Sequence, residues 1–212
     1  MQLFIFGDSI AFGFYSSYGG GWVQKIQNKF TPLYPGEESL HVFNLSISGE
    51  NTLGVLERFD REFSSRAFED HDHTIIFAIG INDSVLNTSN SKPVTPINDF
   101  DKNYQTLINR ARNYSEKILL LGLTPVDTSI LSPIPWAPEL SMSNQSTREF
   151  DTAIQMIAKR NDVSYLDLFN VIAEGEHSDF FLDGLHPNDE GHKIIADHVS
   201  EFLITNNWIL CS

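Results

Sequence analysis

The stretch Leu3-Phe4-Ile5-Phe6-Gly7-Asp8-Ser9-Ile10 begins as an apolar run and ends with a glycine, an acid and a hydroxyl. Four apolar residues in direct succession are typical of a strand that is buried on both faces of a parallel sheet. Polar side chains at the end of such a strand lie at the sheet edge where open α/β proteins bind ligands. This stretch therefore predicts both the kind of sheet and the place of a site on it.

The rest of the chain repeats the order of strand and then helix. Further apolar runs occupy residues 41–45, 74–79, 118–123 and 163–168. Apolar residues at helical spacing lie between these runs, at 22–30, 56–63, 100–111, 150–158 and 195–203. This alternation predicts an α/β fold with a five-stranded parallel sheet and helices on both of its faces. Because no linker or repeat interrupts the pattern, we expect one domain over residues 1–212.

The charge balance limits the possible partners. The chain carries 28 acidic and 14 basic residues, a formal net charge of −14. Such a surface repels phosphate backbones and anionic headgroups, so we expect no nucleic-acid partner. No apolar stretch approaches the roughly 18–20 residues of a membrane span, so no integral membrane association is expected. The start of the chain lacks a basic, signal-like segment, which predicts a cytoplasmic location, or secretion if a leader has been removed.

Four separated segments carry residues that could take part in chemistry, three of them directly after predicted strands and one just before the last helix. They are Gly7-Asp8-Ser9-Ile10, Asn44-Leu45-Ser46-Ile47-Ser48-Gly49, Gly80-Ile81-Asn82-Asp83 and Asp183-Gly184-Leu185-His186-Pro187. Because the carboxyl ends of parallel strands share one edge of the sheet, these segments are predicted to converge there.

The residue types at this edge suit acyl transfer from an ester. A serine hydroxyl becomes a nucleophile when a neighbouring base takes its proton, and histidine titrates in the range that this task needs. A carboxylate can fix the tautomer of that histidine, and Asp183 lies three residues before His186. Backbone amides and a carboxamide can stabilise the oxyanion that forms.

In their order along the chain, these blocks resemble the GDSL (SGNH) hydrolase family, with Ile10 where the family name has leucine. The likeness extends from residue 7 to residue 187. It implies a three-layer α/β/α sandwich similar to flavodoxin. It also implies an esterase with a small-molecule ester as its partner and with neither a metal nor an organic cofactor.

The same resemblance assigns roles residue by residue. It implies Ser9 as the nucleophile, His186 as the base and Asp183 as the group that orients the base. The implied oxyanion hole consists of the backbone amides of Ser9 and Gly49 together with the side chain of Asn82.

The substrate stays open at this stage. Sixteen phenylalanines and the proline-rich segment 125–143, which contains Trp136, favour a lipid-type or a short to medium acyl ester, such as a lysophospholipid. A carbohydrate deacetylase on the same triad is the alternative. An alternative from another class is a non-enzymatic flavodoxin-like module, since Tyr18-Gly19-Gly20-Gly21-Trp22 could cradle an anion or a flavin phosphate. The pair of Asp183 and His186 argues against it, because phosphate binding does not need such a pair.

Several further features carry expectations of their own. The Gly-x-Ser-x-Gly elbow is absent, so Ser9 is expected on a loop. Asp8 is expected to hold that loop and Asp83 to brace the loop of Asn82. The cluster Asp70-His71-Asp72-His73 is interpreted as a solvated strand entry and His192 as a packing residue. Whether the long connections 84–98 and 125–143 act as a lid is left open, and Cys211 has no evident base partner.

Overall fold

Five strands form one parallel sheet in the computed structural model, which describes residues 1–34, 39–174 and 180–209. Their order across the sheet is β2-β1-β3-β5-β7. The strands are β1 (Gln2–Gly7), β2 (His41–Asn44), β3 (His73–Ala78), β5 (Lys117–Leu121) and β7 (Ser164–Leu166). This is the flavodoxin-like order, in which the direction of strand succession reverses between β1 and β3. The predicted fold class is confirmed.

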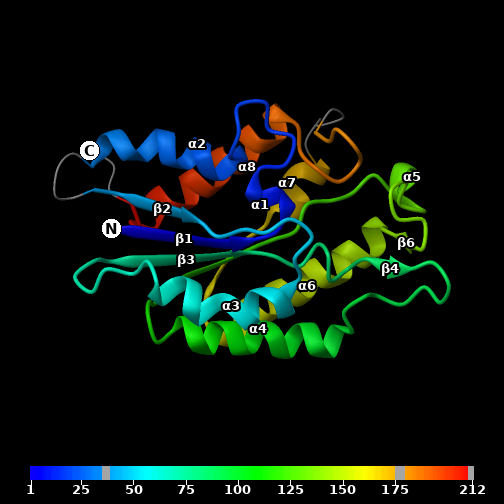
Figure 1. Cartoon of the computed structure of the whole chain (residues 1–212), viewed down its shortest axis with the longest axis horizontal. Helices are drawn as coiled ribbons and strands as arrows, with labels where there is room; N and C mark the ends of the chain where they lie inside the picture. The colour runs from blue at the N-terminus through cyan, green and yellow to red at the C-terminus, as the bar shows by residue number, and fades with distance from the viewer. Residues whose placement is uncertain (35–38, 175–179, 210–212) are drawn as a thin grey trace.

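Helices cover both faces of this sheet. The long helices are α2 (Gly21–Phe30), α3 (Thr52–Ser64), α4 (Ile97–Ala111), α6 (Asn144–Asn161) and α8 (Asp189–Thr205), and a shorter one is α7 (Leu168–Glu174). Figure 1 shows α2 and α8 over one face and α3 and α4 over the other. The two hydrophobic clusters follow the same division, with α6 on the side of α4 and α7 on the side of α8.

The position of β1 in the sheet explains why its apolar residues do not alternate with polar ones. Successive side chains of a strand point to opposite faces of the sheet. Phe4 and Phe6 pack in the cluster beneath α3, α4 and α6, whereas Leu3 and Ile5 pack in the cluster beneath α2, α7 and α8. All four side chains are fully buried because β1 lies inside the sheet, between β2 and β3.

The expectation that Ser9 lies on a loop is wrong. Ser9 begins a one-turn helix, α1 (Ser9–Phe12), directly after β1. The Asp8 carboxylate accepts a hydrogen bond from the Ile10 amide at 2.9 Å and thereby caps this helix, and Gly13 ends it at a φ of 93°. An aspartate cap and a left-handed glycine are strong local signals for helix ends, but they bracket too few residues to show helical spacing.

The two long connections contain structure that the sequence did not indicate. Connection 84–98 holds β4 (Leu86–Asn87), and connection 125–143 holds α5 (Thr128–Leu131) and β6 (Leu140–Ser141). Strands β4 and β6 pair antiparallel, so the two connections form one unit at the end of the molecule toward which the parallel strands point (Figure 1). Strands of two residues are too short to show a period in the sequence.

Candidate active site

A pocket of about 520 Å³ opens where the predicted blocks converge. It is lined by Ser9, Phe14, Tyr15, Ser48, Gly49, Asn82, Trp136, Asp183, Leu185 and His186. Each site residue named from the sequence is therefore part of this one pocket. Its walls come from the ends of β1, β2 and β3 and from the turn before α8, which is the sheet edge at the reversal of strand order.

Three side chains of the pocket form a continuous hydrogen-bonded line. The Nε2 atom of His186 lies 2.8 Å from the Oγ atom of Ser9. The Nδ1 atom of the same ring lies 2.7 Å from Oδ2 of Asp183. A carboxylate only accepts hydrogen bonds, so Nδ1 carries the proton and Nε2 is left to accept the hydroxyl proton of Ser9. The Ser9 and His186 side chains are buried, which shields this line from bulk water.

The turn before α8 holds the carboxylate in place. Oδ1 of Asp183 accepts hydrogen bonds from the backbone amides of Leu185 at 3.0 Å and His186 at 2.8 Å. Burial alone would raise the pKa of Asp183, but the hydrogen bonds from the backbone and ring of His186 and from Leu185 lower it below the usual value. Asp183 is therefore ionised at neutral pH, as a group that orients an imidazole must be.

A second wall of the pocket, formed by Gly49 and Asn82, presents hydrogen-bond donors. Gly49 lines the pocket with a φ of 80°, and, its two chain neighbours aside, no atom of the described residues lies within 4 Å of the position that a Cβ would occupy, so there is open space beside its backbone. The side-chain amide of Asn82 donates one hydrogen bond to the carbonyl of Glu50 at 2.8 Å. An amide nitrogen has two hydrogens, so the second can be offered to a ligand in the pocket.

A network behind this wall fixes the donors. Arg58 of α3 forms a largely buried ion pair with the Glu50 side chain, with 2.7 Å between its Nε and Oε1 and a second contact between Nη2 and Oε2. Asp83 accepts hydrogen bonds from Thr52, at 3.0 Å from the amide and 2.7 Å from the hydroxyl. Burial raises the pKa of Asp83, while the Thr52 bonds act to lower it. Asp83 thus braces the Asn82 segment, in agreement with the expected role.

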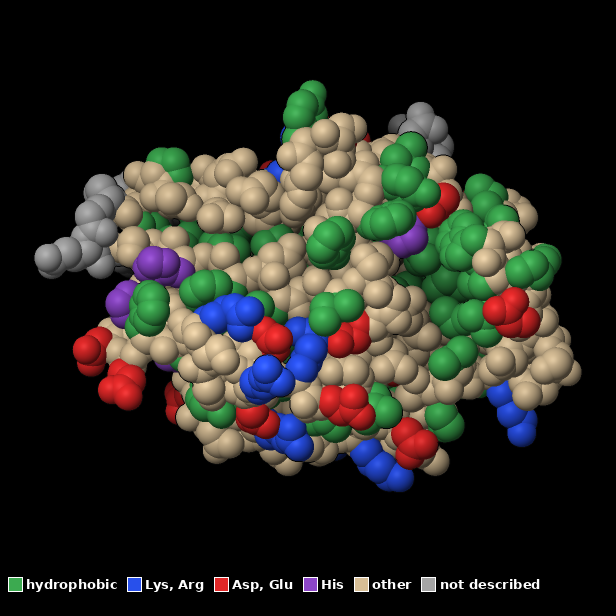
Figure 2. Space-filling model, viewed as in Figure 1, with side chains coloured by type: hydrophobic (Ala, Val, Ile, Leu, Met, Phe, Trp, Pro, Cys, Tyr) green, Lys and Arg blue, Asp and Glu red, His purple; other side chains and the backbone are tan. Residues whose placement is uncertain are grey.

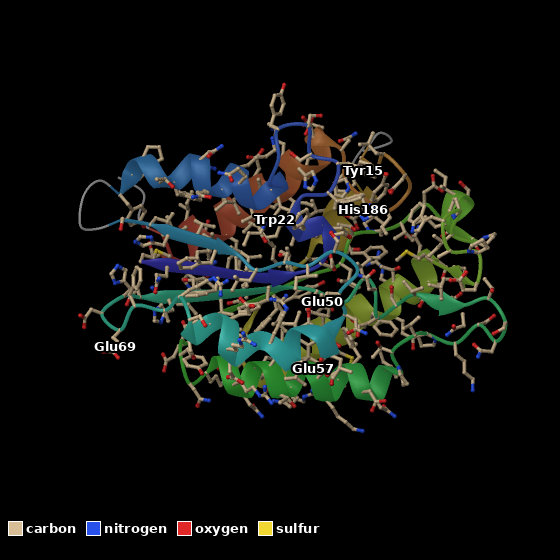
Figure 3. All side chains as sticks on the ribbon, in the orientation of Figure 1. Tyr15, Trp22, Glu50, Glu57, Glu69 and His186 are labelled. Atoms are coloured by element: carbon tan, nitrogen blue, oxygen red, sulfur yellow. The ribbon has the colours of Figure 1, made fainter. Side chains whose placement is uncertain are left out.

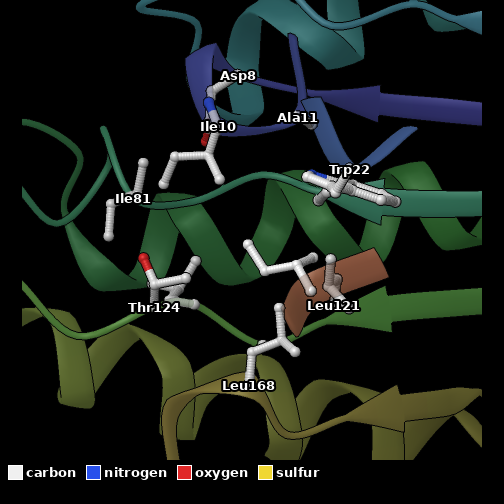
Figure 4. Close-up of a pocket in the computed structure, with 12 residues that line it drawn as sticks. Asp8, Ile10, Ala11, Trp22, Ile81, Leu121, Thr124 and Leu168 are labelled. Atoms are coloured by element: carbon white, nitrogen blue, oxygen red, sulfur yellow. Dashed lines mark hydrogen bonds between the residues drawn. The ribbon is translucent and has the colours of Figure 1, made fainter. Parts of the chain in front are cut away.

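Asp8 directly precedes the nucleophile, and its carboxylate bonds to the Ile10 amide at the start of α1. Burial raises its pKa to about 7; the Ile10 amide opposes this shift, and the nearby charges of Asp83 and Glu50 add to it. A second cavity, of about 30 Å³, is lined in part by Asp8, Trp22 and Thr124 (Figure 4). This volume is enough for one or two waters and too small for an ester substrate.

Other residues singled out in the sequence lie away from the line of three side chains. His73 lies at the start of β3, where its Nε2 atom is 3.0 Å from Oε1 of Gln2. In the parts of the chain that the structure describes, no group of three or more metal-ligating side chains forms a metal site, and no helix is long and apolar enough to cross a bilayer. His192 is fully buried. Cys211 lies outside the described residues.

The sequence indicated Trp136 but not Phe14 and Tyr15, the other two aromatic residues that line the pocket. Phe14 and Tyr15 follow α1 directly, and Trp136 comes from the connection between β5 and β6. Their side chains are 40%, 49% and 56% exposed, respectively. Figure 2 shows hydrophobic side chains gathered at this end of the molecule, over the region of α5 and β6. The position of Phe14 and Tyr15, a few residues after the Gly-Asp-Ser block, was the signal that could have indicated them.

A three-layer α/β fold that carries a hydroxyl, an imidazole and a carboxylate in line within one pocket defines the class of this protein as a hydrolase. The chain belongs to the GDSL-like lipase/acylhydrolase family, whose profile matches residues 5–194, and it is a hydrolase of ester bonds. The family resemblance noted in the sequence blocks is thereby confirmed.

Individual relatives are similar over nearly the whole chain. The GDSL esterase/lipase WDL1 of Oryza sativa subsp. japonica is 24% identical, over 98% of this chain and 79% of the rice protein. The human isoamyl acetate-hydrolyzing esterase 1 homolog is 24% identical, over 93% of this chain and 79% of its own length. A crystal structure of a lipase/acylhydrolase from Enterococcus faecalis superposes with a TM-score of 0.74 at 20% identity, over 95% and 94% of the two chains, which supports the fold.

Proposed function

We propose that the protein hydrolyses carboxylic esters through an acyl-Ser9 intermediate. The observation that carries this proposal is the line of contacts from Ser9 Oγ through His186 to Asp183, at 2.8 and 2.7 Å. Ser9 Oγ bonds to the ester carbonyl carbon while His186 Nε2 takes the hydroxyl proton. The tetrahedral intermediate then expels the alcohol, to which His186 returns the proton. Water attacks the acyl group with His186 again as base, which releases the acid and restores Ser9.

The oxyanion of each tetrahedral intermediate needs donors on the other side of the carbonyl carbon. We assign this task to the backbone amides of Ser9 and Gly49 and to the side-chain amide of Asn82. The support is that Gly49 lines the pocket with open space beside its backbone and that Asn82 is held by the Glu50 carbonyl while one of its hydrogens is left for the ligand. Donors fixed before the reaction stabilise developing charge without a cost of reorganisation.

The substrate that the pocket favours is an uncharged ester with an apolar group. Three partly exposed aromatic side chains, Phe14, Tyr15 and Trp136, border the pocket, and none of the described residues that line it is a lysine or an arginine. A net charge of −14 further disfavours anionic substrates such as coenzyme A thioesters. A volume of about 520 Å³ accommodates short to medium chains. The name of the human relative refers to an ester of this kind, a small neutral acetate.

A substrate panel against wild type and Ser9→Ala tests the proposal. The panel comprises p-nitrophenyl acetate, octanoate and palmitate, an acetylated sugar and an acyl-coenzyme A. We expect turnover of the neutral nitrophenyl esters by wild type, covalent labelling of Ser9 by a fluorophosphonate probe, and loss of both in Ser9→Ala. Turnover that survives in Ser9→Ala would exclude the mechanism. Preference for the acetylated sugar would instead identify a carbohydrate deacetylase that uses the same residues.

A further inference from the structure

Two features noted in the sequence have no part in the mechanism above: His192 and the glycine-rich segment at residues 18–22. The structure brings them together in one substructure, the loop of residues 13–20 between α1 and α2, hereafter the aromatic loop. This loop carries Phe14 and Tyr15 over the pocket.

The backbone of the aromatic loop is unusual. Gly13, Gly19 and Gly20 all have positive φ, as glycine permits. Tyr15 has a φ of 62° as well, a conformation that is unfavourable for a residue with a Cβ. Such conformations persist where surrounding contacts over-determine them, and they are frequent at functional sites. The left-handed backbone of Tyr15 therefore indicates that surrounding contacts hold its side chain in place.

Two hydrogen bonds attach the loop to the first turn of α8, the helix that begins just after His186. Nε2 of His192 donates to the Phe14 carbonyl at 3.1 Å. The Ser17 amide donates to Oδ1 of Asp189 at 2.9 Å. Burial lowers the pKa of His192, so the ring stays neutral with its hydrogen on the nitrogen that faces Phe14. Gly21 approaches so closely that a Cβ there would lie 2.9 Å from the His192 ring.

The loop places two aromatic rings against His186. The Phe14 ring lies 4.8 Å from the imidazole, and the Tyr15 ring lies 5.7 Å from it in an edge-on arrangement. The two aromatic rings also contact each other at 4.7 Å. Figure 3 shows Tyr15 and His186 next to each other, although they come from opposite ends of the chain. Both rings retain exposed surface toward the pocket.

The chemistry decides which part of an ester these rings would meet. His186 must give its proton to the departing alcohol, so that alcohol leaves beside the imidazole. In the proposed function, the carbonyl oxygen is directed toward the donors of Gly49 and Asn82, which also line the pocket. A group packed on Phe14 and Tyr15 is therefore the alcohol part of the ester and not its acyl chain.

We propose that Phe14 and Tyr15 form the specificity wall for the leaving alcohol and select an uncharged, apolar alcohol group. His192 and Asp189 are positioning residues that hold this wall against His186. The inference rests on the proposed function, because it assumes that His186 protonates the leaving group.

The primary test varies the alcohol at a constant acyl group, with ethyl, butyl and benzyl acetates as substrates for wild type and Tyr15→Gly. Glycine adopts the left-handed backbone without steric cost, so the variant removes the ring and leaves the fold intact. We expect kcat/KM for benzyl acetate to fall about tenfold relative to ethyl acetate in Tyr15→Gly, because the variant removes the apolar surface that the benzyl group would contact. Within each enzyme the three substrates share one rate of deacylation, because all of them form the same acetyl-Ser9, so the comparison isolates the acylation step.

Tyr18→Ala is the matched control for the ring. Tyr18 belongs to the same loop, is 90% exposed and is not a lining residue of the pocket. Its removal should leave the ratio of benzyl to ethyl acetate unchanged. The inference fails if Tyr15→Gly keeps the wild-type alcohol ratio, or if it changes the preference for acyl length instead.

The attachment to α8 is tested with Asp189→Ala and the control Glu190→Ala. Both variants remove one acidic side chain from the first turn of α8, but only Asp189 bonds to the loop, whereas Glu190 contacts Lys193. We expect Asp189→Ala to reduce the ratio of kcat/KM for benzyl acetate to kcat/KM for ethyl acetate about threefold. Asp189→Asn keeps an acceptor oxygen and should restore this ratio. Equal ratios in Asp189→Ala and Glu190→Ala would overturn the positioning role.

Absence of all ester turnover in wild type would overturn the proposed function itself, whereas turnover without alcohol preference would overturn only this inference.

Discussion

The two walls of the pocket are built in different ways. On one wall, Ser9, His186 and Asp183 are connected side chain to side chain, and the groups that are proposed to react hold one another. On the other wall, Gly49 and Asn82 are held from behind, by the Glu50 carbonyl and the network around it. The geometry of the first wall therefore depends on a few residues, whereas that of the second depends on the surrounding scaffold. Substitutions should therefore have abrupt effects on the first wall and graded effects on the second.

Asp183→Asn is expected to have the largest effect among the variants that leave the nucleophile in place. An amide can donate a hydrogen bond to Nδ1 and so favour the tautomer that cannot accept the Ser9 proton. We expect kcat to fall by about 10³–10⁴-fold, with KM little changed. Steady-state kinetics on a nitrophenyl ester would measure this, and thermal unfolding would check that the variant is folded. A loss below tenfold would contradict the assigned role.

Asn82→Ala addresses the other wall directly. Removal of one of three donors should lower kcat by about 10²–10³-fold, because the remaining amides still bind the oxyanion. KM should change much less, since the donor acts mainly on the tetrahedral state. Asn103→Ala is a matched control, because Asn103 donates to Thr52 in the same network and is not a lining residue of the pocket. Equal losses in the two variants would mean that Asn82 acts only through the network.

Arg58→Ala sharpens the comparison by disturbing the scaffold alone. The ion pair with Glu50 is largely buried, and loss of one partner leaves an uncompensated charge next to the Gly49 segment. We expect kcat to decrease by about tenfold through displaced donors. The Tm should also fall, and Arg58→Lys should restore part of both. Arg61→Ala, which removes another arginine from the same helix, is the control. An unchanged kcat in Arg58→Ala would show that the wall of Gly49 and Asn82 does not need the ion pair.

Asp8→Asn is expected to have the smallest effect, and a different one, because it concerns stability. The pKa of Asp8 is raised to about 7 in the folded protein, so between pH 4 and 7 the folded state binds more protons than the unfolded state. Stability attributable to this group is therefore present at low pH and is lost as the pH rises toward 7. Asparagine keeps the helix-capping oxygen and cannot ionise.

The expected result for Asp8→Asn is a gain in the free energy of unfolding of about 1 kcal/mol at pH 8, or roughly 2–4 °C in Tm. The gain should disappear near pH 4, where both side chains are uncharged. Thermal unfolding of wild type and variant at several pH values would measure it. A gain independent of pH would show that the ionisation of Asp8 is not the cause.

Most of the scaffold and the membership of the site were accessible from the sequence. Continuous apolar runs such as Leu3 to Phe6 identify strands covered on both faces, and helical spacing identifies the layers between them. The blocks at the strand ends gave Ser9, Gly49, Asn82, Asp183 and His186, all of which line one pocket. These signals can be recognised in the sequence because each depends on residues that are close together in the chain or on a period repeated over many residues.

The remaining features were decided only by tertiary contacts. Strands β4 and β6 pair with each other across two long connections, and Tyr15 takes its left-handed backbone in a loop that is attached to a helix at the other end of the chain. Asp83 likewise accepts its two hydrogen bonds from Thr52, which lies 31 residues earlier in the chain. The sequence by itself therefore determined the sheet, its layers and the chemical groups at its edge. Which side chains support those groups, and which ring faces the imidazole, depended on contacts between distant segments that no local period encodes.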